Sequence, residues 1–189
     1  MTFRLNISLT DIKGTTGALF LARDAAFARE MSRQLQNKAI GKTYLALVDT
    51  TSNPLAEKRG EIRSPISYND GRAYIGAGNE AKAAATDWKL LASSKEGPVA
   101  LLRLRLLTGL KHQLRVHLSQ VLQSTSFDHS TCHAYSFIFS TAPVLGDRLH
   151  GRTNPRGSSR MFLHASHLSI PVSRPVMGRG MHLTTFPAI

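Results

Sequence analysis

Residues 99–118 read VALLRLRLLTGLKHQLRVHL, and this stretch predicts a strand followed by a helix. In residues 99–107 apolar and basic side chains alternate, which is typical of an antiparallel strand with one buried face. Its polar side chains, Arg103 and Arg105, suit an RNA-facing sheet and equally an ordinary solvated face. Thr108-Gly109 ends the alternation. The apolar residues that follow mark one face of a helix: Leu110, Leu114, Leu118, Val121 and Leu122.

The rest of the chain supplies more strands and a second helix. Asp24 is a typical N-cap, and apolar residues at every fourth position predict an amphipathic helix from Ala25 to Asn37. Residues 49–83 are rich in Gly and Pro, so we expect hairpins and loops there, with a short strand around Ile62. The predicted fold class is therefore α+β, a mostly antiparallel bent sheet with flanking helices. Four further strands are predicted, at Gly17–Ala22, Lys42–Val48, Thr86–Leu91 and Met161–Ile170.

Composition indicates one soluble domain, residues 1–189. No apolar run approaches the roughly 18–20 residues that span a bilayer. The single cysteine, Cys132, excludes an internal disulfide and fits a reducing compartment. The 24 basic residues against 12 acidic ones give a formal net charge of +12. Such an excess favours a polyanionic partner, most often nucleic acid. The alternative is a generally basic surface, as in many organellar proteins.

The densest polar cluster lies where the helix after Gly109 is expected to start. At helical spacing, Lys111 and His112 share a face with Arg115. Because the N-terminal end of a helix favours anions, a phosphate or a carboxylate is the natural partner of these side chains. The alternative is a solvated basic helix end.

Other histidine clusters do not predict a metal site. His129, Cys132 and His133 have side chains that bind zinc, but no fourth ligand stands at a suitable spacing. His164 and His167 lie three residues apart on a predicted strand, so we expect them on opposite faces and not as a ligand pair. We therefore expect no metal.

Four blocks of the chain resemble known motifs when they are taken together. The blocks are KGTTGALFLA (13–22), KTYLALV (42–48), TGLKHQLRVHL (108–118), and PVLGD (143–147) with LHA (163–165). In this order and spacing they are similar to the RluA-type pseudouridine synthases, whose motifs are HRLDxxTSGLLLLA, KxYxAxV, TGRxHQIRxHL, PILGD and LLHA. The resemblance covers residues 13–123 and 143–170. Leu110 replaces the usual Arg, a form that resembles mitochondrial members.

The resemblance implies a bent antiparallel sheet with a cleft for RNA. It implies isomerisation of uridine to pseudouridine in structured RNA, ribosomal RNA in particular, without a metal or an organic cofactor. The target nucleotide is flipped out of its stack, the C1′–N1 bond breaks, the base turns and C5 joins C1′. An aspartate carboxylate acts on the nucleotide. By resemblance, Arg115 keeps that carboxylate ionised, Tyr44 stacks on the base and helps to move a proton, and Leu163 lines the pocket.

We accordingly predict catalytic roles for Asp11, Tyr44 and Arg115. The predicted partner is RNA, and we expect a monomer with no membrane contact and no obligatory protein partner. The basic charge and the form of the 108–118 block favour a mitochondrial location over a cytoplasmic or nuclear one. The residues predicted to bind substrate or RNA are Lys13, Thr15, Thr16, Lys42, Arg103, Lys111, His112, Gln113 and Leu163.

Two segments depart from the family pattern. Aligned without a gap, the first block puts Ile12 where the family has its catalytic aspartate, and Asp11 stands one residue away. A bulge would let Asp11 take that place, since one extra residue re-aims a strand. Otherwise the chain is a catalytically inactive RNA-binding remnant. We also expect the family's strands before the aspartate motif to be missing from this chain.

Residues 124–141, rich in Ser, Thr, His and Phe, form an insert before the PVLGD block. We hypothesise that residues 1–12 and 124–141 are translated intron or misjoined exon sequence. The alternative is a diverged protein with a tolerated surface loop. Sequencing the mature transcript across both junctions decides between these two explanations.

Overall fold

The computed structural model describes residues 14–20, 22, 24–51, 55, 57–122, 142–151 and 160–171. Its helices are α1 (Ala25–Gln36) and α2 (Gln113–Gln120). Its strands are β1 (Thr15–Gly17), β2 (Gly41–Asp49), β3 (Arg59–Arg63), β4 (Ile66–Asn69), β5 (Arg72–Ile75), β6 (Ala85–Ser93), β7 (Val99–Leu106) and β8 (Leu163–Ser169).

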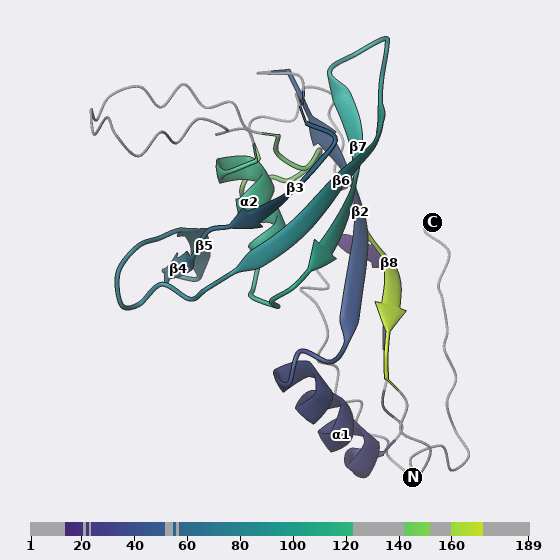
Figure 1. Cartoon of the computed structure of the whole chain (residues 1–189), viewed down its shortest axis with the longest axis vertical. Helices are drawn as coiled ribbons and strands as arrows, with labels where there is room; N and C mark the ends of the chain where they lie inside the picture. Colours follow the sequence, from purple (N-terminus) through teal and green to yellow (C-terminus); the bar gives the residue numbers. More distant parts are fainter. Residues whose placement is uncertain are drawn as a thin grey trace.

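Six strands form one twisted sheet in the order β1-β8-β2-β7-β6-β3, and β4 and β5 form a separate hairpin (Figure 1). β1 and β8 are parallel, and all other neighbours are antiparallel. α2 lies against the sheet beside the β4–β5 hairpin, whereas α1 lies beyond the start of β2 (Figure 1). This mostly antiparallel α+β architecture confirms the predicted fold class. Neither described helix is long and apolar enough to cross a membrane.

Local sequence accounts for most of these elements. The Asp24 carboxylate accepts a hydrogen bond from the backbone N–H of Phe27 at 2.8 Å, so the predicted N-cap of α1 is confirmed. The predicted strands at 42–48, 86–91 and 99–107 are confirmed as β2, β6 and β7, and the strand around Ile62 as β3.

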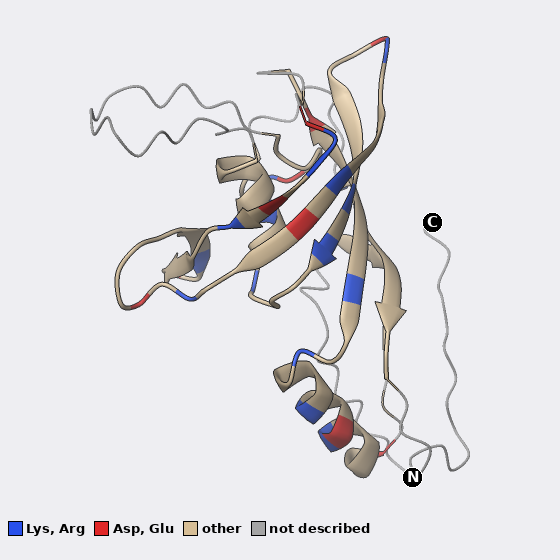
Figure 2. Ribbon diagram, viewed as in Figure 1, with Lys and Arg blue, Asp and Glu red and all other residues tan. Residues whose placement is uncertain are grey.

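The large sheet has an apolar inner face and a polar outer face. Directly opposed residues on neighbouring strands share a face. Tyr44, Leu104 and Trp88 are opposed on the inner face, where leucines of α2 pack against them in one core cluster. On the outer face, Arg103 lies between Leu45 and Lys89. In Figure 2 the ribbon is coloured at basic and acidic residue positions along β6 and at basic positions along β7.

β1 differs from the strand predicted at Gly17–Ala22. The strand spans Thr15–Gly17, and residues 18–20 carry no strand. Gly17 has a φ of +111°, and a Cβ added there would overlap the Ala165 carbonyl of β8. The chain therefore passes very close to β8 at Gly17, in a conformation that glycine adopts readily, and leaves the ladder after it.

α2 starts later than predicted. It begins at Gln113, because His112 has a left-handed φ of 56° that prevents the helix from extending back through Lys111. The prediction that Lys111 and Arg115 share one helix face is therefore wrong.

A bulge in β8 overturns the prediction for His164 and His167. Ala165 is opposite Tyr44 and His167 is opposite Thr43, so Ser166 is an extra residue in the ladder. One extra residue shifts the two-residue period. His164 and His167 therefore both face the outer side of the sheet. Within the described ranges, no three His, Cys, Asp or Glu residues come close enough together to hold a metal ion.

Candidate nucleotide-binding site

Arg115 and Asp147 form a two-bond ion pair beside the start of α2. Nε of Arg115 donates to Oδ2 of Asp147 at 2.7 Å, and Nη2 donates to Oδ1 at 2.6 Å. The side chains are only 11% and 1% exposed. A bidentate ion pair of this kind fixes the plane of the guanidinium group as well as its position.

Asp147 is held by a tight turn attached to β2. The N–H of Leu145 donates to the Leu47 carbonyl at 2.9 Å. Gly146 has a φ of +77°, and a Cβ added there would overlap the Arg160 carbonyl, so the turn requires glycine. The N–H groups of Leu149 and His150 both donate to Oδ1 of Asp147, at 2.9 and 3.0 Å.

The electrostatics of this turn keep Asp147 ionised. Burial alone would raise the pKa of its carboxyl. The Arg115 hydrogen bonds and charge, with the N–H groups of His150 and Leu149, outweigh burial and lower that pKa. The turn therefore places a fixed negative charge against Arg115.

Tyr44 and Leu163 lie on the inner face of the sheet, in the core cluster that also contains Leu114 of α2. Tyr44 is 3% exposed and Leu163 is 5% exposed. Burial raises the pKa of the Tyr44 phenol to about 12, so the ring is neutral at neutral pH. The Tyr44 ring is therefore buried and neutral, and a phenolate is disfavoured.

Gln113 is a buried residue whose side-chain amide links β6 to the segment before α2. Its amide nitrogen donates to the Ala85 carbonyl at 2.9 Å and to Oγ1 of Thr86 at 3.0 Å. Its amide oxygen accepts from Oγ1 of Thr108 at 2.8 Å and from the N–H of Leu110 at 3.1 Å. These four bonds use the full capacity of an amide, so the predicted RNA contact of Gln113 gives way to a structural role.

The sheet divides the other predicted binding residues between its faces. Thr15 is paired with Leu163 on the inner face. Lys42 is also on the inner face, and burial lowers the pKa of its amino group. Its Nζ lies so close to Gly109 that a Cβ added to that glycine would be 2.7 Å away from it. Thr16 and Arg103 are on the outer face, where Oγ1 of Thr16 lies 2.9 Å from Nδ1 of His164. The structure therefore does not bring Arg103 or Thr16 together with Tyr44.

Lys111 and His112 flank the start of α2. The Lys111 side chain is exposed, and its carbonyl accepts a hydrogen bond from the Tyr68 hydroxyl at 3.1 Å. Nδ1 of His112 lies 3.1 Å from Nε2 of His150, with the rings edge to face. The predicted catalytic residue Asp11 and the predicted RNA-binding residue Lys13 lie outside the described residues, as does the 124–141 insert with His129, Cys132 and His133.

Two residues of this site were given no role from sequence. Asp147 stood in the PVLGD block, and His150 follows it. The sequence feature that marks Asp147, besides the PVLGD block, is that it is an acidic residue after a glycine in a chain with twice as many basic as acidic residues. Asp147 pairs with Arg115, 32 positions away, and a contact between such distant positions produces no periodic pattern in the sequence.

We predict that His150 makes the protein less stable in mild acid. Burial, together with the charges of Arg115, His112 and Arg72, lowers its pKa from 6.5 to about 4, although the nearby Asp147 opposes the shift. Between these pH values the unfolded chain binds a proton that the folded chain does not, so the free energy of unfolding falls as pH falls from 6.5 to 4. His150 is only half-buried, so we expect a loss of about 1 kcal/mol.

Urea unfolding of the His150→Gln variant between pH 7 and pH 4 measures this effect. Glutamine keeps a hydrogen-bonding group toward His112 but does not titrate. The variant should lose less stability than the wild type over this range, with similar stability at pH 7. Equal losses in the two proteins would remove His150 as the cause.

The comparisons with known proteins agree with this geometry. A family model described as RNA pseudouridylate synthase matches residues 13–120, more than half of the 189-residue chain. The chain belongs to the RNA pseudouridylate synthase family. The match includes β1, β2 and α2, which carry Thr15, Tyr44 and Arg115.

Individual relatives are distant and longer. An uncharacterized RNA pseudouridine synthase of Mycoplasma genitalium is 29% identical over 158 residues, which cover 82% of this chain and 44% of that protein. The tRNA pseudouridine synthase C of Yersinia pestis is 28% identical over 185 residues, covering 90% of this chain and 64% of that protein. The solved structure of Human RNA Pseudouridylate Synthase Domain Containing 1 is 28% identical with a TM-score of 0.70, covering 100% of this chain and 69% of that chain. This synthase-family chain thus spans about half to two thirds of the length of these curated relatives.

Proposed function

We propose that this chain isomerises uridine to pseudouridine in structured RNA, with ribosomal RNA as the first candidate substrate. The observation that carries the proposal is the buried Arg115–Asp147 pair on α2, the helix whose Leu114 packs in the same core cluster as Tyr44 and Leu163. A relative named for tRNA makes transfer RNA the second substrate to test. The formal charge of +12 supports a polyanionic substrate.

In the proposed mechanism, the Asp11 carboxylate attacks the flipped-out nucleotide. Arg115, whose Nε and Nη2 are bonded to Asp147, is shared with the Asp11 carboxylate in this proposal, and its charge favours the ionised form of that carboxylate. Tyr44, neutral at the working pH, stacks on the base, which requires that its ring, 3% exposed in the structure, becomes accessible when RNA binds. The carboxylate bonds to C1′ as the C1′–N1 bond breaks, the base turns, and the carboxylate leaves again as C5 bonds to C1′. The proton on C5 is then lost to solvent while N1 gains one, so atoms and electrons balance.

The loss of the C5 proton gives a direct assay. Transcripts of ribosomal and transfer RNA that carry tritium at C5 of uridine should release tritium to water when the full chain is added. Release from one transcript class and not the other identifies the substrate class. No release from either class would reject the isomerase proposal.

A second candidate function is RNA binding without catalysis. It is favoured by the ungapped alignment, which puts Ile12 at the family's aspartate position and Asp11 one residue before it. The two candidates differ in the effect expected from replacing Asp11.

We predict that RNA binds to the inner side of the sheet. Lys111→Ala, at the exposed start of α2, should weaken the affinity for a ribosomal RNA fragment and reduce the salt slope by about 1. Arg103→Ala, which removes a charge from the outer face, should leave that slope unchanged. Fluorescence anisotropy across a salt series measures both variants. A reduced slope for Arg103→Ala instead would place the phosphates on the outer face.

We also propose a mitochondrial location and a monomeric state without an obligatory protein partner. The basic charge and the mitochondrial-like form of the 108–118 block support the location. Imaging of a C-terminal fluorescent fusion tests the location, and sedimentation of the purified chain tests the monomer.

A further inference from the structure

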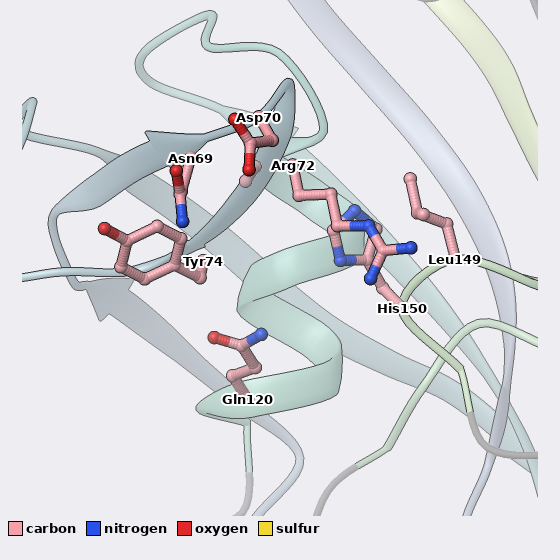
Figure 3. Close-up of a pocket in the computed structure, with 8 residues that line it drawn as sticks. Asn69, Asp70, Arg72, Tyr74, Gln120, Leu149 and His150 are labelled. Carbon is pink, nitrogen blue, oxygen red and sulfur yellow. The ribbon is translucent and has the colours of Figure 1, made fainter.

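A pocket with no assigned role lies between the β4–β5 hairpin, α2 and the turn that follows Asp147. It has a volume of about 740 Å³ and is lined by Asn69, Arg72, Tyr74, Gln120, Leu149 and His150, which we call the hairpin pocket. Figure 3 shows Tyr74 between Asn69 and Gln120, and Arg72 on the side of His150. Sites for nucleotide-sized ligands have volumes of about 300–1,000 Å³, so this pocket is large enough for one nucleotide.

The hairpin that forms one wall is held firmly in place. The N–H of Ile75 donates to Oε1 of Gln120 on α2 at 2.8 Å. Ile66 of β4 and Val116 of α2 are both 0% exposed and pack in one core cluster. Asp70 and Gly71 both have positive φ, as a tight two-residue hairpin turn requires. The wall is therefore preorganised, which limits the entropy cost of binding.

The side chains that this wall presents suit a nucleotide. Asn69 is opposite Arg72, and Ser67 is opposite Tyr74, so Asn69, Arg72 and Tyr74 share the hairpin face turned away from the core. Tyr74 is 42% exposed, and its side chain has no hydrogen-bond partner among the described residues. An exposed ring next to an arginine and an amide offers a stacking surface, a phosphate contact and a base-edge contact.

The charges in the pocket give the bound nucleotide a direction. Asp70, at the hairpin tip, also lines the pocket. Arg72 acts electrostatically on His150, and Figure 3 shows the two side chains next to each other on the side of the pocket away from Tyr74. A phosphate is thus favoured near Arg72 and His150, and the base near Tyr74 and Asn69.

The hairpin pocket adjoins the Arg115–Asp147 pair through His150. The N–H of His150 donates to Asp147, which holds Arg115, and the His150 ring contacts His112 at the start of α2. The turn after Asp147 is therefore a wall that both sites share. A nucleotide close along the strand to one in the first site can reach the second.

We propose that the hairpin pocket binds one unstacked RNA nucleotide that flanks the target uridine, with its base on Tyr74 and its phosphate at Arg72. This inference rests on the RNA substrate of the proposed function and identifies that substrate as a loop or single strand at the modification site. Duplex RNA would keep the flanking base in its stack and away from Tyr74.

Binding of a fluorescein-labelled octauridylate to the full chain tests the proposal by anisotropy. Tyr74→Ala should weaken binding at least about fivefold, whereas Tyr74→Phe, which keeps the ring, should bind within about twofold of wild type. Arg72→Ala should weaken binding and reduce the salt slope by about 1. The matched control Arg59→Ala removes an equal charge from an exposed position on β3 and should leave the slope unchanged.

A second measurement does not depend on variants. Octauridylate containing 5-iodouridine should cross-link on irradiation to the peptide that contains Tyr74. Wild-type binding by Tyr74→Ala, or cross-links that never include this peptide, would overturn the subsite.

If the chain binds RNA but replacing Tyr74 has no effect, the subsite fails and RNA binding stands. If Tyr74 matters but tritium is not released, isomerisation fails and the subsite stands. If the chain does not bind octauridylate at all, the subsite fails, and tritium release from structured RNA still decides the isomerase proposal.

Discussion

Replacing Asp147 by alanine is expected to lower the free energy of unfolding by about 3–5 kcal/mol. The change removes the carboxylate that neutralises Arg115 through two hydrogen bonds, in a pair that is 11% and 1% exposed. It also takes the acceptor from the N–H groups of Leu149 and His150. Urea denaturation at pH 7, followed by circular dichroism, measures the loss.

The matched control is the exposed pair between Arg63 and Glu61, whose side chains are 74% and 33% exposed. Glu61→Ala should cost less than about 1 kcal/mol, because water screens the pair. The double variant Arg115→Met/Asp147→Leu should recover part of the stability that Asp147→Ala loses, since apolar residues of similar size replace both charges. Similar small losses for Asp147→Ala and Glu61→Ala would show that the buried pair does not organise the site.

Asp11→Asn is expected to reduce pseudouridine formation by at least about 10³-fold while RNA affinity stays within about twofold of wild type. Asparagine has nearly the same shape as aspartate but lacks the ionised carboxylate that attacks the nucleotide. Phosphate contacts from Lys111 and other basic residues do not depend on this group, so binding should persist. Single-turnover rates and anisotropy on the same RNA measure the two effects separately.

The control Asp87→Asn makes the same chemical change on β6, at a position opposite Arg105 on the outer face, and should retain the wild-type rate. Persistent activity in Asp11→Asn would show that Asp11 is not the catalyst. If neither the wild type nor the variant isomerises RNA but both bind it, the inactive RNA-binding function is the better description.

The repeated patterns of the chain could be predicted from sequence. The two-residue alternation in 99–107 and the four-residue spacing after Asp24 predicted β7 and α1, because these periods follow directly from strand and helix geometry. Motif blocks placed Tyr44, Arg115 and Leu163 in one family site, and the fold places Tyr44 and Leu163 together on the inner face.

Features that depend on single residues or on distant contacts could not be predicted. The bulge at Ser166 puts His164 and His167 on the same face of the sheet, although a regular strand would put them on opposite faces. No sequence period signals an extra residue in a strand ladder. The polar side chain of Gln113 looked available to RNA until its four internal partners were known. Arg103 was predicted to bind RNA, and its charge does not tell that it lies on the opposite face of the sheet from Tyr44.

The most direct test of the central claim is tritium release by the wild-type chain from ribosomal RNA tritiated at C5 of uridine, with binding to the same RNA measured in parallel. Isomerisation by this chain should release tritium in excess of the enzyme-free blank and in an amount equal to the pseudouridine formed. RNA binding without any release of tritium would contradict it, and would make this chain a member of the synthase family that binds RNA and does not modify it.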